Sequence, residues 1–147
     1  LEIYTSRDGE VIFKKYSLLG GVEDFASELC ETMSRSTGSV CAVTDRDTII
    51  AVAGGSKREL MGKRITPELE EIMEGRKIYQ YSGDERAIPV SEGLDTLTAA
   101  VAAPILAEGD LLGLVLFIST SPGAVTGESE FKLAKTIAAF LGRHMES

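Results

Sequence analysis

The side chains that could support chemistry in this chain are two cysteines, Cys30 and Cys41, and a single histidine, His144. The cysteines lack the CxxC spacing of zinc sites and of thioredoxin-like redox sites. Both occur within apolar patterns, where a free cysteine usually behaves as a small buried hydrophobic residue. No Ser-His-Asp set, phosphate-binding loop, paired-carboxylate signature or metal-ligand cluster is recognisable. We therefore expect no catalytic residue, no metal site and no cofactor.

The composition limits the classes of partner. The chain has 147 residues and a formal net charge of −8, which fits one acidic domain. An acidic surface repels the phosphates that supply most affinity for nucleic acids, so we expect this chain alone to bind DNA poorly. Two cysteines without a disulfide framework favour a cytoplasmic location. The apolar runs are shorter than the ~20 residues of a membrane helix.

The start of the chain predicts a hairpin followed by a helix. Residues 1–5 and 10–16 alternate apolar and polar side chains around the turn-forming pair Asp8-Gly9. Residues 18–21 have the composition of a linker. From Val22 onward apolar residues recur every three or four positions, which is the spacing of an amphipathic helix. Because the chain begins as though inside an element, we expect it to be a fragment of a longer protein.

Later segments alternate between strand and helix signals. Residues 39–44, 48–53, 78–82, 97–106 and 111–120 are rich in β-forming residues and are separated by turn compositions. These patterns predict a sheet built of hairpins, with a polar loop before the fourth of these strands.

Two short helices are predicted between the second and third of these strands. Ser56 followed by Glu59 matches a capping box, in which the two side chains satisfy backbone donors at a helix start. Thr66 is a favoured N-cap and Pro67 suits the first helical position. Gly75 is suited to close the second helix.

Residues after Thr126 predict a long helix with a wide apolar arc. An arc of this width suits contact with two surfaces, the helix's own sheet and another helix. We expect the second surface to pair subunits in a homodimer or higher homo-oligomer through a helical bundle. The residues expected at this interface are Phe131, Leu133, Ile137, Phe140 and Leu141.

The order of elements predicts an α+β fold with an antiparallel sheet between N- and C-terminal helices. This order fits the GAF and PAS classes of sensor domain, and helices at both ends that share one sheet face favour GAF. The chain contains no Asn, which excludes the Asn-Lys-Phe-Asp-Glu motif of cyclic-nucleotide GAF domains. Neither cysteine has a neighbouring histidine, which disfavours a bilin chromophore.

A GAF fold holds its ligand between one sheet face and the helices and loops above it, here residues 55–95. Donors at a helix start, tyrosines on a strand and small residues beside the sheet would suit such a pocket. The expected ligand-binding residues are Ser56, Lys57, Tyr79, Tyr81, Ala100 and Ala102. Each also has a structural interpretation. Ser56 would be a helix cap and Lys57 a solvated charge. The tyrosines would be ordinary strand residues, and the alanines would let a helix pack close to the sheet.

Short motifs occur in one order along nearly the whole chain. They are residues 6–17, Asp45-Arg46-Asp47, Gly55-Ser56-Lys57, Pro104-Ile105, Gly109-Asp110, Gly113 and residues 138–143. In this order they resemble the stage V sporulation protein T family of transcriptional regulators. In that family an N-terminal swapped-hairpin domain binds DNA as a dimer, and C-terminal GAF domains assist oligomerisation.

The resemblance implies three segments. Residues 1–17 would be the last hairpin of a truncated DNA-binding domain, residues 18–21 a linker, and residues 22–147 a GAF-like regulatory domain. The implied function is effector sensing and oligomerisation in a sporulation transcription factor, with DNA contacted only by the missing N-terminal domain. Two alternatives stay open: an assembly module without a ligand, and a cysteine-dependent GAF enzyme such as a free methionine sulfoxide reductase.

Overall fold

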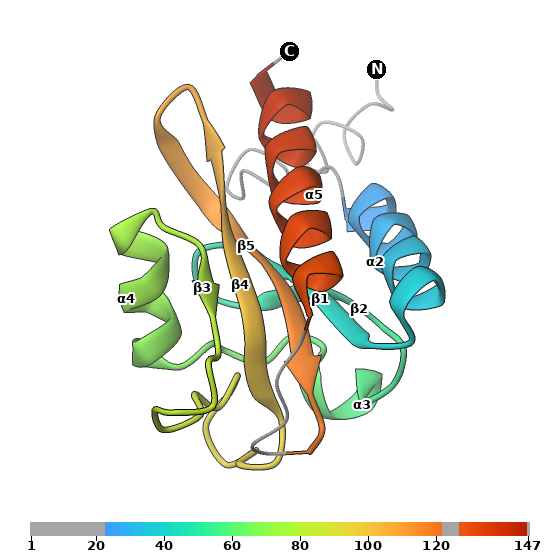
Figure 1. The fold of residues 1–147 in the computed structure, drawn as a ribbon. Coiled ribbons are helices and arrows are strands. Elements are labelled where there is room, and N and C mark those ends of the chain that lie inside the picture. The colour runs from blue at the N-terminus through green and yellow to red at the C-terminus, as the bar shows by residue number, and fades with distance from the viewer. Residues whose placement is uncertain (1–22, 122–126, 147) are drawn as a thin grey trace, which may run out of the picture.

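A computed structural model describes residues 23–121 and 127–146 of the chain (Figure 1). One antiparallel sheet, with strand order β2-β1-β5-β4-β3, lies between helices on both faces. The predicted hairpin of residues 1–16, the linker of residues 18–21 and the Thr126 cap lie outside the described residues. The elements are α2 (Glu23–Thr37), β1 (Val40–Thr44), β2 (Ile49–Ala53), α3 (Lys57–Leu60), α4 (Pro67–Gly75), β3 (Tyr79–Gln80), β4 (Thr98–Ala107), β5 (Asp110–Ser119) and α5 (Glu128–Glu146).

The sheet is buried on both faces, which explains why its strands are apolar at successive positions rather than alternating. Every residue of β1 and β2 is buried, and β5 is buried from Leu111 to Ile118. The hairpin predicted between residues 39–44 and 48–53 is confirmed, since β1 and β2 pair antiparallel from Cys41–Ala53 to Thr44–Ile49. The long β4–β5 hairpin forms the centre of the sheet.

Helices α2 and α5 cover one face of the sheet, and Figure 1 shows them side by side. Helix α2 packs on β1 and β2, whereas α5 packs on β4 and β5. The core beneath them combines buried residues of α2, such as Met33, with Leu141 of α5 and Phe117 of β5. Gly142 brings α5 against β4, because a Cβ atom there would lie 2.0 Å from the Leu106 carbonyl oxygen.

Helices α3 and α4 cover the other face, together with the loop that leads to β4. The N-cap prediction for α4 is confirmed: Thr66 Oγ1 accepts a hydrogen bond of 3.3 Å from the Leu69 N–H, and Pro67 is the first helical residue. Thr66 Oγ1 also donates to the Pro89 carbonyl oxygen at 2.9 Å. This pair of bonds fixes the start of α4 to the loop that precedes β4.

One local prediction is wrong, and another is met only in part. Ser56 has φ 61° and makes no side-chain capping bond, so the expected capping box with Glu59 does not form. A capping residue has extended backbone, whereas Ser56 is left-handed and its hydroxyl cannot reach the helix donors in the required way. Helix α4 does end at Gly75, but the left-handed residue that closes it is Arg76, with φ 59°.

No helix among residues 23–121 and 127–146 has the length and apolarity needed to cross a membrane.

Candidate functional site

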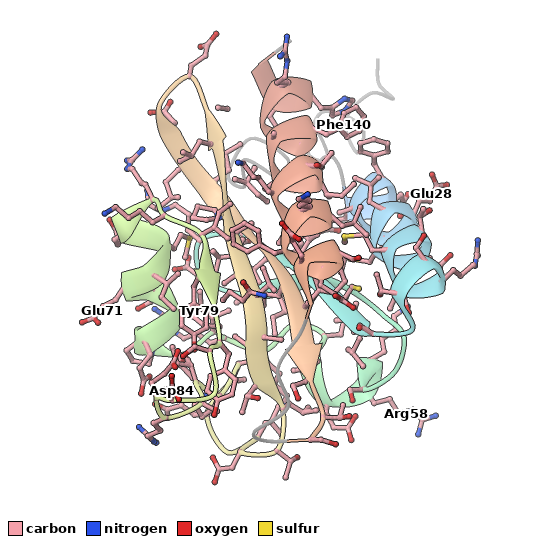
Figure 2. All side chains as sticks on the ribbon, viewed as in Figure 1. Glu28, Arg58, Glu71, Tyr79, Asp84 and Phe140 are labelled. Atoms are coloured by element: carbon pink, nitrogen blue, oxygen red, sulfur yellow. The ribbon has the colours of Figure 1, made fainter. Side chains whose placement is uncertain are left out.

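The expected ligand-binding residues do not come together. Ser56 and exposed Lys57 follow β2, at one edge of the sheet, while Tyr79 belongs to β3, at the opposite edge. Figure 2 shows the separation, with Arg58 of α3 and Tyr79 on opposite sides of the molecule. The set therefore cannot form one pocket, because three strands lie between its two halves.

The two alanines of the expected set lie on opposite faces of β4. Residue pairing skips between Ala99 and Val101, which marks a β-bulge at Ala100. As a result Ala100 packs in the core beneath α2 and α5, whereas Ala102 packs in the core beneath α3 and α4. Both are buried, so neither lines an open space as the sequence had suggested.

The sheet face beneath α3 and α4 is filled by side chains. Leu60 of α3 and Leu69 of α4 are fully buried in one cluster with Leu114 and Leu116 of β5. Tyr79 is half-buried at the margin of this cluster, and Tyr81 is 7% exposed. A ligand on this face would have to displace packed residues.

The Tyr79 hydroxyl, expected to face a ligand, is instead bonded within the chain. It donates to Glu85 Oε2 at 3.2 Å, and Ser82 Oγ donates to Glu85 Oε1. Burial, followed by the charge of Glu85, raises the pKa of Tyr79 to about 12. The hydrogen bond from Ser82 is the main reason that the pKa of Glu85 is lowered. These bonds tie β3 to the loop that begins at Ser82.

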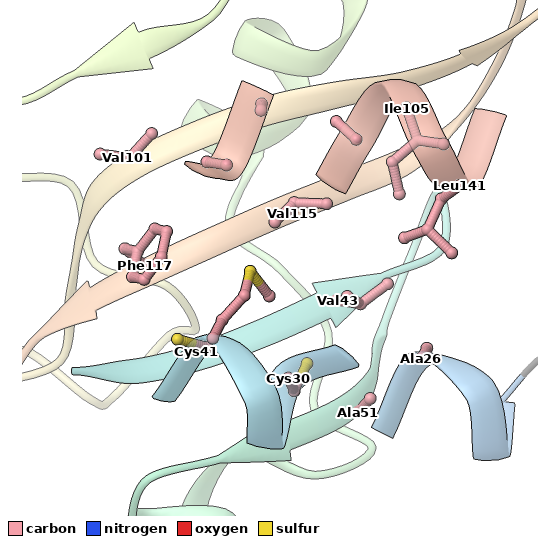
Figure 3. Close-up of a cluster of buried hydrophobic side chains, with 14 of the residues drawn as sticks. Ala26, Cys30, Cys41, Val43, Ala51, Val101, Ile105, Val115, Phe117 and Leu141 are labelled. Atoms are coloured by element: carbon pink, nitrogen blue, oxygen red, sulfur yellow. The ribbon is translucent and has the colours of Figure 1, made fainter. Parts of the chain in front are cut away.

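Both cysteines lie in the core beneath α2 and α5 (Figure 3). Each has 0% exposure, and they are free thiols. Burial raises the pKa of the Cys30 thiol far above its ordinary value and the pKa of Cys41 to about 12. The thiolate is the reactive form of cysteine, so these environments suppress thiol chemistry at neutral pH.

A charged groove of about 500 Å³ lies between the β1–β2 turn and α4. The arginine of this groove is paired within the chain, because Arg46 Nη2 lies 3.1 Å from Glu74 Oε2. The turn is held by Asp45, whose Oδ1 accepts bonds of 2.8 Å from the backbone N–H groups of Asp47 and Thr48. Among the residues that the structure describes, no group of three or more His, Cys, Asp or Glu side chains is placed to hold a metal ion.

An apolar surface, which we call the α2–α5 face, runs along the two neighbouring helices. Its residues are Phe25 and Leu29 of α2 with Leu133, Ile137 and Phe140 of α5.

Phe140 is 47% exposed, and Leu133 and Ile137 are half-buried. The Phe25 and Phe140 rings lie 5.7 Å apart between centroids, and the Phe25 and His144 rings lie 4.8 Å apart.

The expected interface set is divided by its burial. Phe131, Leu133 and Ile137 are half-buried and keep some accessible surface, as does Phe140. Leu141 is fully buried in the chain's own core and has no surface to offer a partner. Phe25 is not in the expected interface set, although it lies on the apolar stripe that the sequence predicts for the first helix.

Comparison with known proteins identifies the relatives of this chain. Residues 21–146 match the family model described as "Stage V sporulation protein T C-terminal, transcription factor". Stage V sporulation protein T of Bacillus subtilis (strain 168) is 39% identical over 147 residues, which span 99% of this chain and 81% of that protein.

Solved structures with a similar fold are more distant in sequence. The cofactor-binding GAF domain of the nutrient sensor CodY from Clostridium difficile has a TM-score of 0.61 at 12% identity, covering 99% of this chain and 98% of its own. A type II free methionine-R-sulfoxide reductase from Thermoplasma acidophilum has a TM-score of 0.62 at 11% identity, covering 84% and 94%. A GAF domain/HD domain protein from Geobacter sulfurreducens has a TM-score of 0.59 at 18% identity, covering 88% and 97%. The first and third of these structures contain GAF domains, so the chain has a GAF-like fold, and at these identities all three indicate the fold alone.

Proposed function

The chain belongs to the stage V sporulation protein T family of transcription factors and has its C-terminal, GAF-type domain, and on that premise we propose that this domain assembles and regulates its parent protein. The domain would bring subunits together and pass a small-molecule signal to an N-terminal DNA-binding domain. The observation that carries the assembly role is the exposed α2–α5 face.

The α2–α5 face has the chemistry of a subunit interface. Large apolar side chains on two adjacent helices stay in contact with water in the single chain, and Phe140 leaves 47% of its surface exposed. Contiguous apolar surface of this kind marks interaction sites on soluble domains. A two-fold axis beside α2 and α5 would pack the four helices of two subunits as a bundle. The same residues of both subunits would then form the interface.

The contribution of Phe140 to the free energy of dimerisation follows from its exposed fraction. Complete burial of a Phe side chain contributes about 2 to 3 kcal/mol, so covering the exposed half contributes ~1 kcal/mol per subunit. A two-fold interface contains the residue twice, which gives about 2 kcal/mol, or roughly a 30-fold change in Kd.

Sedimentation velocity of the wild type and of Phe140→Ser tests the assembly role. We expect the wild type to form dimers at micromolar concentration and Phe140→Ser to raise the Kd by roughly 30-fold. The matched control is Met61→Ser, which removes another exposed apolar side chain, 42% exposed, at the far end of the short helix α3. A monomeric wild type, or equal effects of the two substitutions, would refute the proposed interface.

The proposed regulation is a shift between two subunit arrangements. An effector alters DNA binding only to the extent that it binds one arrangement more tightly than the other. Helix α5 is the element suited to carry this coupling, because it contacts β4 and β5 on one side and α2 on the other. A ligand that changes how α5 rests on β4 would therefore also change the α2–α5 face.

The enzyme alternative has little support in the described residues. Both thiols are buried and their pKa values are raised, as described above. We therefore propose that the two cysteines serve packing, and that the domain is not a methionine sulfoxide reductase.

A further inference from the structure

A second groove lies between α5 and the edge of β4, and we call it the α5–β4 groove. It has a volume of about 370 Å³, within the range of small-molecule sites. Its floor is apolar and includes Ile78, Pro104, Leu106 and Ala139. It lies along the edge of β4 that β3 leaves unpaired beyond Ala102, where α5 and the end of α4 both approach that edge.

The floor of the groove leaves apolar surface in contact with solvent. Leu106 is 36% exposed, although it belongs to the central β4–β5 hairpin. Ala139 of α5, which also lines the groove, is exposed. An apolar ligand body lying along the groove would remove apolar surface from water, which is the main source of affinity in such sites.

The rim of the groove is positively charged. Lys135, Ala139 and Arg143 follow one another at four-residue spacing, so they share one face of α5 and place a cation on either side of the small residue. Arg76 supplies a third cation from the end of α4. Among the residues that the structure describes, no acidic side chain lines the groove, although the whole chain has a net charge of −8.

Two of the rim cations can pair with a charged ligand. Within the described residues, neither Lys135 nor Arg143 forms a salt bridge. Lys132, one turn earlier on the same helix, is in contrast paired with Glu128 at 3.5 Å. Arg76 differs from these two residues, because its guanidinium already donates a hydrogen bond to the carbonyl oxygen of Gly109. Lysine and arginine are the usual partners of carboxylates, and arginine can bind both oxygens at once.

We propose that the α5–β4 groove binds a small organic carboxylate with an apolar body. Lys135 and Arg143 hold the carboxylate, and the hydrocarbon part packs on the apolar lining, which includes Ile78, Pro104 and Ala139. The volume is too small for a folded partner, and the apolar floor disfavours an inorganic anion. This inference deepens the proposed effector input and rests on the proposed function only for its regulatory meaning.

The groove also lies where a ligand would act on the assembly. Gly142, next to the rim residue Arg143, is the point where α5 touches the Leu106 carbonyl. A ligand that contacts both α5 and Leu106 would hold the helix against β4. The carboxylate would then favour one arrangement of the α2–α5 face over another.

Isothermal titration calorimetry with octanoate tests the binding. We expect saturable binding of one octanoate per protomer, and at least tenfold weaker binding of acetate, which lacks the body, and of 1-octanol, which lacks the charge. The double variant Lys135→Gln/Arg143→Gln should weaken octanoate binding at least tenfold, whereas Lys132→Gln should leave it within twofold. All three positions are exposed, so the folded state should be retained.

A second variant tests the floor independently of charge. Ala139→Met adds a flexible side chain to an exposed helix position that lines the groove, and we expect it to weaken octanoate binding at least fivefold. Absence of saturable octanoate binding, binding that survives the double variant, or equal loss with Lys132→Gln would overturn the inference. Binding of an acidic peptide in place of octanoate would overturn it as well.

Sedimentation of the same samples separates this inference from the proposed function. Intact dimers that bind no octanoate would overturn the groove alone. Octanoate binding by a chain that stays monomeric would overturn the assembly proposal alone.

Discussion

The contact between α5 and β4 depends on a residue without a side chain, and Gly142→Ala is the perturbation that tests it. A Cβ atom at this position would lie 2.0 Å from the carbonyl oxygen of Leu106 and 3.0 Å from its carbon. Because no real Cβ contact is shorter than 3.0 Å, the helix must move away from the strand by about 1 Å. Neither partner at this contact is a flexible side chain, so the movement involves backbone.

Two opposing terms set the size of the effect. Alanine is favoured over glycine within a helix by about 1 kcal/mol, which would stabilise the variant if the site were open. Against this, overpacking a core costs about 1 to 3 kcal/mol, and moving α5 also loosens Leu141, whose complete burial contributes about 2 kcal/mol. We therefore expect Gly142→Ala to lower the free energy of unfolding by about 1 to 3 kcal/mol.

Urea unfolding followed by far-UV circular dichroism measures this difference, with all variants at one protomer concentration because assembly adds to apparent stability. The matched control is Gly75→Ala at the end of α4, where a Cβ atom would meet nothing within 4 Å. That substitution should be neutral or stabilising by up to about 1 kcal/mol. A Gly142→Ala protein as stable as the Gly75→Ala protein would refute the described packing of α5 on β4.

The remaining predictions concern the α4 cap and the buried thiols. Thr66→Ala removes the acceptor of the Leu69 N–H and should lower the free energy of unfolding by about 1 to 2 kcal/mol in urea titrations, whereas Thr136→Ala on the exposed side of α5 should change it by less than about 0.5 kcal/mol. Cys30 and Cys41 should react with a thiol reagent at neutral pH only as fast as the chain unfolds, and rapid labelling of the folded chain would contradict their burial. The pKa of Cys41 is raised from 9.0 to about 12, so the unfolded chain loses the thiol proton at lower pH than the folded chain. The resulting stabilisation of the folded state is complete below pH 9 and is lost as the pH rises through about 12. Over this range the free energy of unfolding should therefore decline more steeply in the wild type than in Cys41→Ala.

Local features of the fold were readable from the sequence. The pairing of β1 with β2 follows from two adjacent β-rich runs and the Asp45 turn between them. The start of α4 follows from Thr66 and Pro67, since a cap needs only residues within one helical turn. Ser56 was misread because its residue type satisfies the capping pattern, whereas the Gly54-Gly55 turn delivers it in a left-handed conformation.

The ordered short motifs indicated the family correctly. The candidate site could be predicted from the sequence only in part. Lys135 and Arg143 share a face of α5 by simple helical spacing, so the grouping of two of the three rim cations was visible in the sequence. Arg76 and Leu106 join them only because α4 ends beside the β4–β5 turn, where Arg76 reaches Gly109. Phe140 and Leu141 are neighbours of similar apolarity, yet the fold exposes one and buries the other.

The sequence by itself determined the β1–β2 and β4–β5 hairpins, the described helices and their apolar arcs, because these depend on interactions between residues close along the chain. Only the tertiary structure decided the strand order, which separates Lys57 from Tyr79, and the bulge that sends Ala100 and Ala102 to opposite faces. A bulge displaces the twofold alternation of a strand by one residue, and its position depends on pairing with β5 rather than on any local residue type. Sites assembled across a sheet inherit this dependence, because their geometry is set by contacts between residues distant in sequence.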